Sequence, residues 1–293
     1  MKKVLVFLRL MRPANIATSV ADVLAGIAIS GYFLGAGQEF LPVILLCLST
    51  IGLYGGGIVF NDVFDAELDK IERPERAIPS GAVSIGEATV LGIILLAIGL
   101  LAAFAFSVWS GLVAFMILVF ALIYNKFGKH HSFLGPLNMG LCRGLNLLLG
   151  ISIISLSLQN HYFLGIVPLI YIFSITMISQ GEVHGSNRNK LYTGAFLYLI
   201  VIGSILYSAY LQQHLLYAGL FLIAFAWMIF KPLFVAIKDP VGRNIGKAVK
   251  AGVISLILMD AAWASAYGQI YFALLIAALL PLSLWLAKRF AVT

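Results

Sequence analysis

The sequence predicts an all-α integral membrane protein, a bundle of nine or ten transmembrane helices. Of its 293 residues, 61% are hydrophobic and 11% are charged, whereas a soluble domain carries about 25% charged residues. The mean hydropathy is +1.02, and apolar stretches long enough to cross a bilayer recur along the chain. No long polar stretch is available for a soluble domain, so we expect residues 1–293 to form a single membrane domain.

Ten apolar stretches are predicted to cross the membrane, because each approaches the roughly 20 residues that a helix needs to span the hydrocarbon. In chain order they are residues 14–35, 41–60, 87–107, 109–125, 133–157, 162–180, 191–211, 215–231, 248–267 and 270–287. The first is too long for the apolar region of a signal peptide. The second ends in a glycine-rich run, Gly52 to Gly57, where another backbone or a substrate can approach closely. If the tenth stretch lies in the membrane interface, the count falls to nine.

Along the chain, turns that carry basic residues alternate with turns that carry none. This arrangement puts 18 of the 19 Lys and Arg residues on one side of the membrane. They are Lys2, Lys3, Arg9, Arg12, Lys70, Arg73, Arg76, Lys126, Lys129, Arg188, Lys190, Lys231, Lys238, Arg243, Lys247, Lys250, Lys288 and Arg289. By the positive-inside rule this side is cytoplasmic, and both termini lie on it. We therefore expect a multi-pass protein of the cytoplasmic membrane.

The strongest chemical signal is the run NDVFDAELD, which begins at Asn61 near the end of the second stretch. On a helix, Asp62, Asp65 and Asp69 fall within roughly 60° of one another, and Asn61 widens the arc to about 100°. Glu67 points away. Three packed carboxylates repel one another unless a cation lies between them, and oxygen ligands that leave room for water and phosphate suit Mg²⁺. The alternative is a solvated, charged helix end.

Basic residues follow at once in the run RPERAIPSG, which begins at Arg73 and includes Arg76. Arginine binds phosphate through a planar fork of N–H donors. Acidic residues that hold a metal, followed by arginines that hold anionic oxygens, are typical of a site that handles a diphosphate. For the arginines alone, the alternative is anchoring at the inner membrane surface.

These two runs together resemble the first signature of the UbiA superfamily, a group of intramembrane aromatic prenyltransferases. Weaker matches are Arg12-Pro13-Ala14-Asn15 at the first stretch, Tyr124 with Lys126 and Lys129 at the end of the fourth, and the run GLCRGLN from Gly140 in the fifth. The resemblance implies a UbiA-type bundle of helices around a central cavity. It also implies Mg²⁺ as the cofactor and a prenyl diphosphate as the substrate.

The second acidic signature of that family, Asp-x-x-x-Asp, should end the sixth helix. Here Glu182 stands in the place of the first acid, and Ser186 stands in the place of the second. Glu182 and His184 are therefore expected to ligate a metal, to bind substrate or to take part in proton transfer. The loop GEVHG that begins at Gly181 is similar to the EboC branch of UbiA-like proteins.

Ionisable residues within the spans are functional candidates, because they are costly in a bilayer and face the interior. Asp22, Arg143 and Asp260 fall in this class. Arg143 and Asn146 lie within about 60° of each other on a helix and can reach an anionic or carbonyl group of a substrate. The alternative for Arg143 is an internal ion pair with Asp22 or Asp260. Asn15 is expected to face the cavity or to hydrogen-bond a neighbouring helix.

The sequence thus predicts Mg²⁺-dependent transfer of a prenyl group to an unidentified small acceptor, an aromatic compound or another alcohol or carbon nucleophile, and no nucleic-acid partner. The expected catalytic and metal-binding residues are Asp62, Asp65, Asp69 and Glu182. The expected substrate-binding residues are Asn15, Asn61, Arg73, Arg76, Tyr124, Lys126, Lys129, Arg143, Asn146 and His184. The alternative is a non-catalytic or transport-related protein with the same fold, since the second acidic signature is incomplete.

Overall fold

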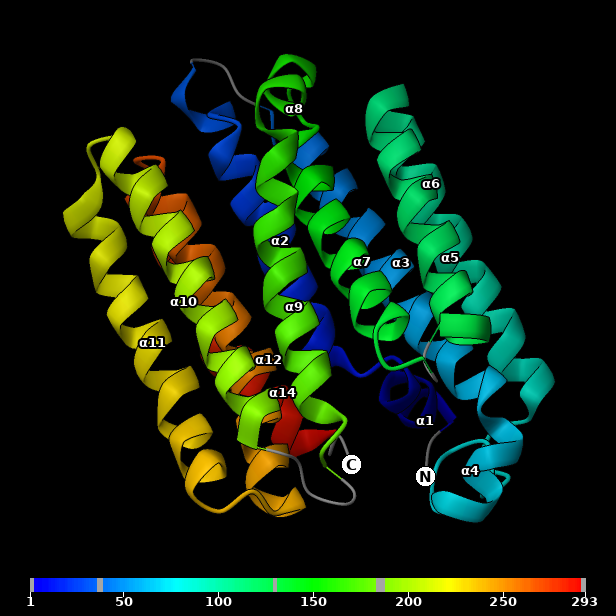
Figure 1. The fold of residues 1–293 in the computed structure, drawn as a ribbon. Coiled ribbons are helices and arrows are strands. Elements are labelled where there is room, and N and C mark those ends of the chain that lie inside the picture. The colour runs from blue at the N-terminus through cyan, green and yellow to red at the C-terminus, as the bar shows by residue number, and fades with distance from the viewer. Residues whose placement is uncertain (1–2, 36–38, 129–130, 183–187, 291–293) are drawn as a thin grey trace.

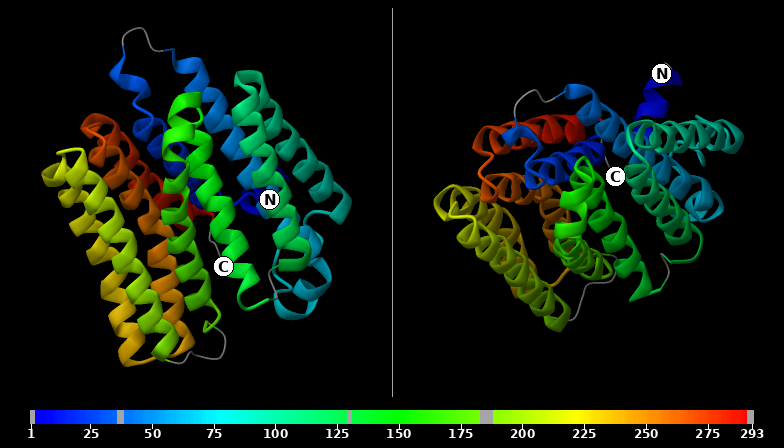
Figure 2. Two further views of the ribbon diagram at one scale, coloured as in Figure 1. Left: turned by 45° about the horizontal axis from the view of Figure 1, so that its top comes forward. Right: turned by 90° about the horizontal axis from the view of Figure 1, so that it is seen from above.

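The computed structural model describes residues 3–35, 39–128, 131–182 and 188–290. These residues form helices joined by short turns, and none of them lies in a β-strand. The long helices stand side by side in a bundle (Figure 1), and the view from above shows the same helices packed alongside one another (Figure 2). The predicted all-α fold is confirmed.

The first half of the chain contains α1 Lys3–Leu10, α2 Pro13–Ile29, η1 Tyr32–Leu34, α3 Phe40–Phe64, α4 Ala66–Glu72, α5 Ile85–Phe106, α6 Val108–Ile123, the π-helical turn η2 Tyr124–Gly128 and α7 Leu134–Ile151. The second half contains α8 Ser155–His161, η3 Tyr162–Gly165, α9 Ile166–Ser179, α10 Arg188–Leu211, α11 Leu215–Lys238, α12 Gly242–Ala266, α13 Ile270–Ala277 and α14 Leu279–Arg289. Each of the predicted spans coincides with at least one of these helices.

Among the described residues, seven helical segments are long and apolar enough to cross a membrane, and the bent pair of α1 and α2 raises the count to eight. The two helices of that pair meet at an angle of 49°. Helices α7 and α12, which carry Arg143 and Asp260, fall outside this count but stand within the bundle (Figure 1). The protein is a multi-pass membrane bundle. The predicted number of nine or ten spans is approximate.

Some predicted helix ends are wrong. Helix α11 runs to Lys238 instead of ending near residue 231, and α12 begins at Gly242 instead of residue 248. The predicted ends were placed where the first charged residues mark the edge of the hydrocarbon. A helix nevertheless continues into water as long as its backbone hydrogen bonds continue, so hydropathy locates the membrane boundary and not the last helical residue.

Helices α3 and α5 approach closely through glycines. Gly52 of α3 and Gly99 of α5 face each other, and a Cβ atom added to Gly99 would lie 2.7 Å from the backbone oxygen of Ser49. Small residues allow two helix backbones to pack in this way without side chains between them. The predicted close approach at the glycine-rich run is confirmed for Gly52, and the neighbour there is a backbone.

A small apolar cluster fixes the end of the bundle that carries the acidic run. Val6 and Leu10 of α1 pack with Val59 of α3, Ala66 of α4 and Ile78 of the following turn. Helix α4, the start of α1 and the end of α14 all lie at the same end of the bundle in Figure 1. The predicted arrangement, in which both termini share a side with the acidic run, agrees with this placement.

Candidate active site

The acidic run forms the end of α3 and the first part of α4. The chain stays nearly helical across the junction, because the N–H of Asp65 donates to Asn61 O at 3.0 Å and the N–H of Asp69 donates to Asp65 O at 2.8 Å. Asp62 and Asp69 are consequently buried on one side, while Glu67 is exposed. Helical spacing predicted this separation correctly.

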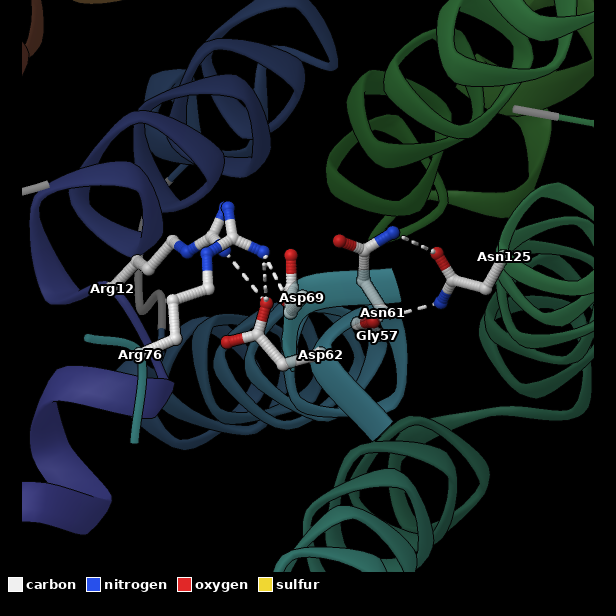
Figure 3. Close-up of polar contacts among 7 residues, drawn as sticks. All are labelled: Arg12, Gly57, Asn61, Asp62, Asp69, Arg76 and Asn125. Carbon is white, nitrogen blue, oxygen red and sulfur yellow. Dashed lines mark hydrogen bonds and ion pairs between the residues drawn. The ribbon is translucent and has the colours of Figure 1, made fainter. Parts of the chain in front are cut away.

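Two arginines bind the buried carboxylates. Arg12 donates to Asp62 Oδ1 at 2.7 Å, and Arg76 donates to Asp69 Oδ2 at 2.7 Å while lying 3.5 Å from Asp62 Oδ1. Figure 3 shows both guanidinium groups meeting above the two carboxylates. Arg12 stands at the bend between α1 and α2 with a left-handed φ of 49°. The sequence offered it only as part of a weaker family match, because a basic residue before the first span also looks like an anchor.

The two acidic signatures lie near each other. Partial burial raises the pKa of the carboxyl group of Glu182, which follows α9, above its usual range, and the positive charge of Arg73, which follows α4, opposes part of that shift. Arg73 is exposed, and Asp65 is half-buried. The segments that follow α4 and α9 stand at the same end of the bundle (Figure 1).

A cavity of about 360 Å³ opens between α2, α3, α6, α7, α9 and α12. Its lining includes five of the predicted site residues, Asn15, Asn61, Tyr124, Arg143 and Asn146. Arg12, which contacts Asp62, lines it too. Much of the remaining wall is apolar, with Leu53, Ile117, Ile172, Ile175, Val253 and Leu256 among its side chains. The predicted central cavity is thus present and adjoins the buried carboxylates Asp62 and Asp69, which we call the acidic cluster.

The far end of the cavity is polar as well. Thr50 lies about 16 Å before Asn61 along α3, at a helical rise of about 1.5 Å per residue. Thr50 donates to Asn146 Oδ1 at 2.7 Å, and Asn146 Nδ2 donates to Asp22 Oδ2 at 2.9 Å. Arg143 forms an ion pair with the same Asp22 oxygen at 3.0 Å and lies over the ring of Tyr54. Arg143 therefore both pairs internally and lines the cavity.

Asp260 lies beside this network on α12. It is fully buried, and neither of its carboxyl oxygens has a hydrogen-bond partner among the described residues. The sequence predicted that Asp22, Arg143 and Asp260 face the interior, and all three do. The pairing of Arg143 with Asp22 is the internal alternative that the sequence left open.

Asn125 is a site residue that the sequence analysis missed. It lies in the π-helical turn η2, lines the cavity and is 4% exposed. Its Nδ2 donates to Gly57 O at 2.8 Å, and its Oδ1 accepts a hydrogen bond from Asn61 Nδ2 at 3.2 Å. The available signal was an asparagine between Tyr124 and Lys126. The sequence analysis considered only the aromatic and basic residues of that segment.

Other predicted residues are not brought to the cavity wall. Lys126 is exposed, with its Nζ 5.2 Å from the centre of the Phe127 ring. Arg73 and Glu182 lie beyond the lining at the same end of the bundle. Lys129 and His184 fall outside the described residues. Their assignments stay predictions.

The donor chemistry suits Mg²⁺ held with phosphate oxygens more than a cage made by protein alone. Across the described part of the chain, no three Asp, Glu, His or Cys side chains group closely enough to hold an ion. The predicted set of Asp62, Asp65, Asp69 and Glu182 is therefore not gathered around one point. Mg²⁺ is usually bound by one or two carboxylates together with water and substrate phosphates. The buried pair Asp62 and Asp69, with Asn61 beside it, fits that mode.

Curated relatives of this chain are enzymes. A digeranylgeranylglyceryl phosphate synthase from Sulfolobus acidocaldarius is 28% identical over 236 residues, which cover 74% of this chain and 81% of the relative. A protein of the same name from Saccharolobus solfataricus is 30% identical over 196 residues, which cover 64% of this chain and 66% of the relative.

Solved structures share the fold. A structure of digeranylgeranylglyceryl phosphate synthase matches with a TM-score of 0.68 and 22% identity, covering 92% of this chain and 100% of that chain. A UbiA homolog from Archaeoglobus fulgidus bound to DMAPP and Mg²⁺ matches with a TM-score of 0.64 and 16% identity, covering 90% of this chain and 99% of that chain. The model of the UbiA prenyltransferase family matches residues 23–244. The chain belongs to the UbiA prenyltransferase family.

Proposed function

We propose that this protein transfers a prenyl group from a prenyl diphosphate to an acceptor within the membrane, with Mg²⁺ as its cofactor. The observation that carries the proposal is the pair of buried carboxylates, Asp62 and Asp69, bound by Arg12 and Arg76 beside a largely apolar cavity. The cluster provides both signs of charge where a metal and a diphosphate would bind. The apolar wall provides space for a hydrocarbon chain.

Asp62, Asp69 and the amide oxygen of Asn61 are the residues that would hold Mg²⁺, which supplies positive charge next to the departing diphosphate. Arg12 and Arg76 exchange carboxylate contacts for diphosphate oxygens and stabilise the negative charge that grows on them. The bond between the prenyl C1 and the diphosphate oxygen breaks, and its electron pair leaves with the diphosphate. The acceptor oxygen or carbon bonds to C1, and its proton passes to the departing diphosphate. The apolar wall excludes water that would capture the allylic cation.

We further propose that the acceptor is an alcohol of the prenylglyceryl phosphate class. The support is the name shared by the relatives, since a digeranylgeranylglyceryl phosphate carries prenyl groups on a glycerol phosphate. Aromatic acceptors are the competing class. The proposed membrane is the cytoplasmic one, with the acidic cluster on its inner face, because the basic residues gather at that end.

The test compares carboxylates on opposite sides of one acidic run. The purified protein is incubated with Mg²⁺, a radiolabelled prenyl diphosphate and either a prenylglyceryl phosphate or an aromatic acceptor, and diphosphate release and labelled lipid are measured. We expect Asp62→Ala and Asp69→Ala to lose at least about 100-fold in rate. The matched control Glu67→Ala, exposed on the opposite side, retains the wild-type rate. No turnover by the wild-type protein with any acceptor would refute the proposal.

A further inference from the structure

The π-helical turn η2 brings Asn125 from the end of α6 against α3. Asn125 is buried and touches α3 at two points, the backbone oxygen of Gly57 and the side chain of Asn61. A π turn inserts a residue into the helical repeat and is frequently found at functional sites. Here the turn places an amide side chain beside the first residue of the acidic run.

The two contacts fix the orientation of both amides. A backbone carbonyl accepts hydrogen bonds and cannot donate, so the group that Asn125 presents to Gly57 O is its NH₂ group. The oxygen of Asn125 therefore faces Asn61, and the group that Asn61 presents in return is its own NH₂ group. The side-chain oxygen of Asn61 is left on the other side. In Figure 3 this oxygen points away from Asn125 and towards the side on which Asp69 and the arginines lie.

We propose that Asn125 is a positioning residue that holds the Asn61 oxygen towards the acidic cluster, so that Asn61 serves as an acceptor for a cation. The inference rests on the proposed function. It assigns which group of the Asn61 amide faces the acidic cluster, the oxygen or the NH₂ group. An oxygen aimed at the cluster can ligate Mg²⁺ or accept from a metal-bound water. The same amide turned over would offer N–H groups, which suit a diphosphate oxygen and repel a cation.

The first test measures the effect of losing the amide of Asn125. Geranyl diphosphate is held at a fixed concentration, Mg²⁺ is titrated, and the rise in melting temperature is followed beside the rate of diphosphate release. We expect Asn125→Ala to need about tenfold more Mg²⁺ for half-maximal stabilisation, as when an outer-shell partner of a metal ligand is lost. The rate at saturating Mg²⁺ recovers towards the wild-type value.

The matched control is Asn138→Ala, which removes a buried amide on α7 outside the cavity lining. Its Mg²⁺ dependence should equal that of the wild-type protein. An unchanged Mg²⁺ dependence in Asn125→Ala would overturn the proposal while leaving the proposed function intact. A wild-type protein that shows no Mg²⁺-dependent stabilisation by geranyl diphosphate would overturn both.

The second test separates acceptor from donor at Asn61 and does not depend on the folding of any Asn125 variant. Asn61→Asp keeps an oxygen and loses the NH₂ group, whereas Asn61→Leu removes both at similar volume. If the oxygen is the working group, Asn61→Asp binds Mg²⁺ and geranyl diphosphate at least tenfold more tightly than Asn61→Leu. If the two variants are equally weak, Asn61 acts through its NH₂ group and the proposal is wrong.

Discussion

At the scale of single residues, Arg143 is a charge at membrane depth whose cost is offset by Asp22. Both side chains are buried, so removing the guanidinium group leaves a carboxylate without its ion partner. We expect Arg143→Met to lower the free energy of unfolding by about 3–5 kcal/mol. The double variant with Asp22→Asn should lose less than Arg143→Met alone, because the stranded carboxylate is also gone. Chemical denaturation in detergent measures this cycle, and strictly additive losses would contradict the pairing.

Some site residues were predictable from the sequence because their spacing alone decides which side of a helix they share. Asp62 and Asp69 are seven positions apart, and a helix returns to the same side after that interval, so their shared burial followed directly. The contact of Arg12 with Asp62 was not predicted, and Asn125 was missed, because both roles come from contacts between helices. Nothing within the local pattern around either residue says which distant side chain it will meet.

At the scale of elements, the contact of α3 with α5 determines where the acidic run stands. A Cβ atom on Gly99 would lie 2.7 Å from both Ser49 O and Leu53 N, and neither backbone atom can move without shifting α3. We expect Gly99→Ala to destabilise the protein by about 1–3 kcal/mol, as other overpacked contacts do. The measurement is the melting temperature in detergent.

The matched control for this contact is Gly203→Ala on α10, where an added Cβ meets nothing within 4 Å. It should melt at or above the wild-type temperature, since alanine is the better helix former. A loss equal to that of Gly99→Ala would mean that glycine content, and not close packing, sets the stability of these helices.

The positions of the helices were predictable, whereas their ends and the π turn were not. Lipid requires every backbone group to be satisfied within the span, so each long apolar stretch had to be a helix. That requirement ends at the membrane surface. Beyond it, α11 continues to Lys238 and η2 widens at Tyr124 for reasons that lie in packing and in contacts with other helices.

At the scale of the whole molecule, the distribution of basic residues makes the two ends of the bundle chemically different. The acidic cluster, with Arg12 and Arg76, stands at the end where basic turns gather, and the cavity adjoins it. An anionic diphosphate group would be attracted to that end, and the apolar wall would accommodate the prenyl chain of the proposed substrate. We expect the same charge pattern to orient the chain in the membrane and to select the side from which a diphosphate substrate would enter.

This orientation can be measured with single-cysteine variants in a background where Cys47 and Cys142 are replaced. Ser80 lies in the exposed turn after α4, and Gln212 lies in the exposed turn between α10 and α11 at the opposite end of the bundle. We expect a membrane-impermeant maleimide to label Gln212→Cys in intact bacterial cells and to label Ser80→Cys only after the membrane is opened, because the positive-inside rule keeps the basic turns in the cytoplasm. The reverse labelling would put the acidic cluster outside, and a diphosphate made in the cytoplasm could then not reach Asp62 and Asp69 without crossing the bilayer.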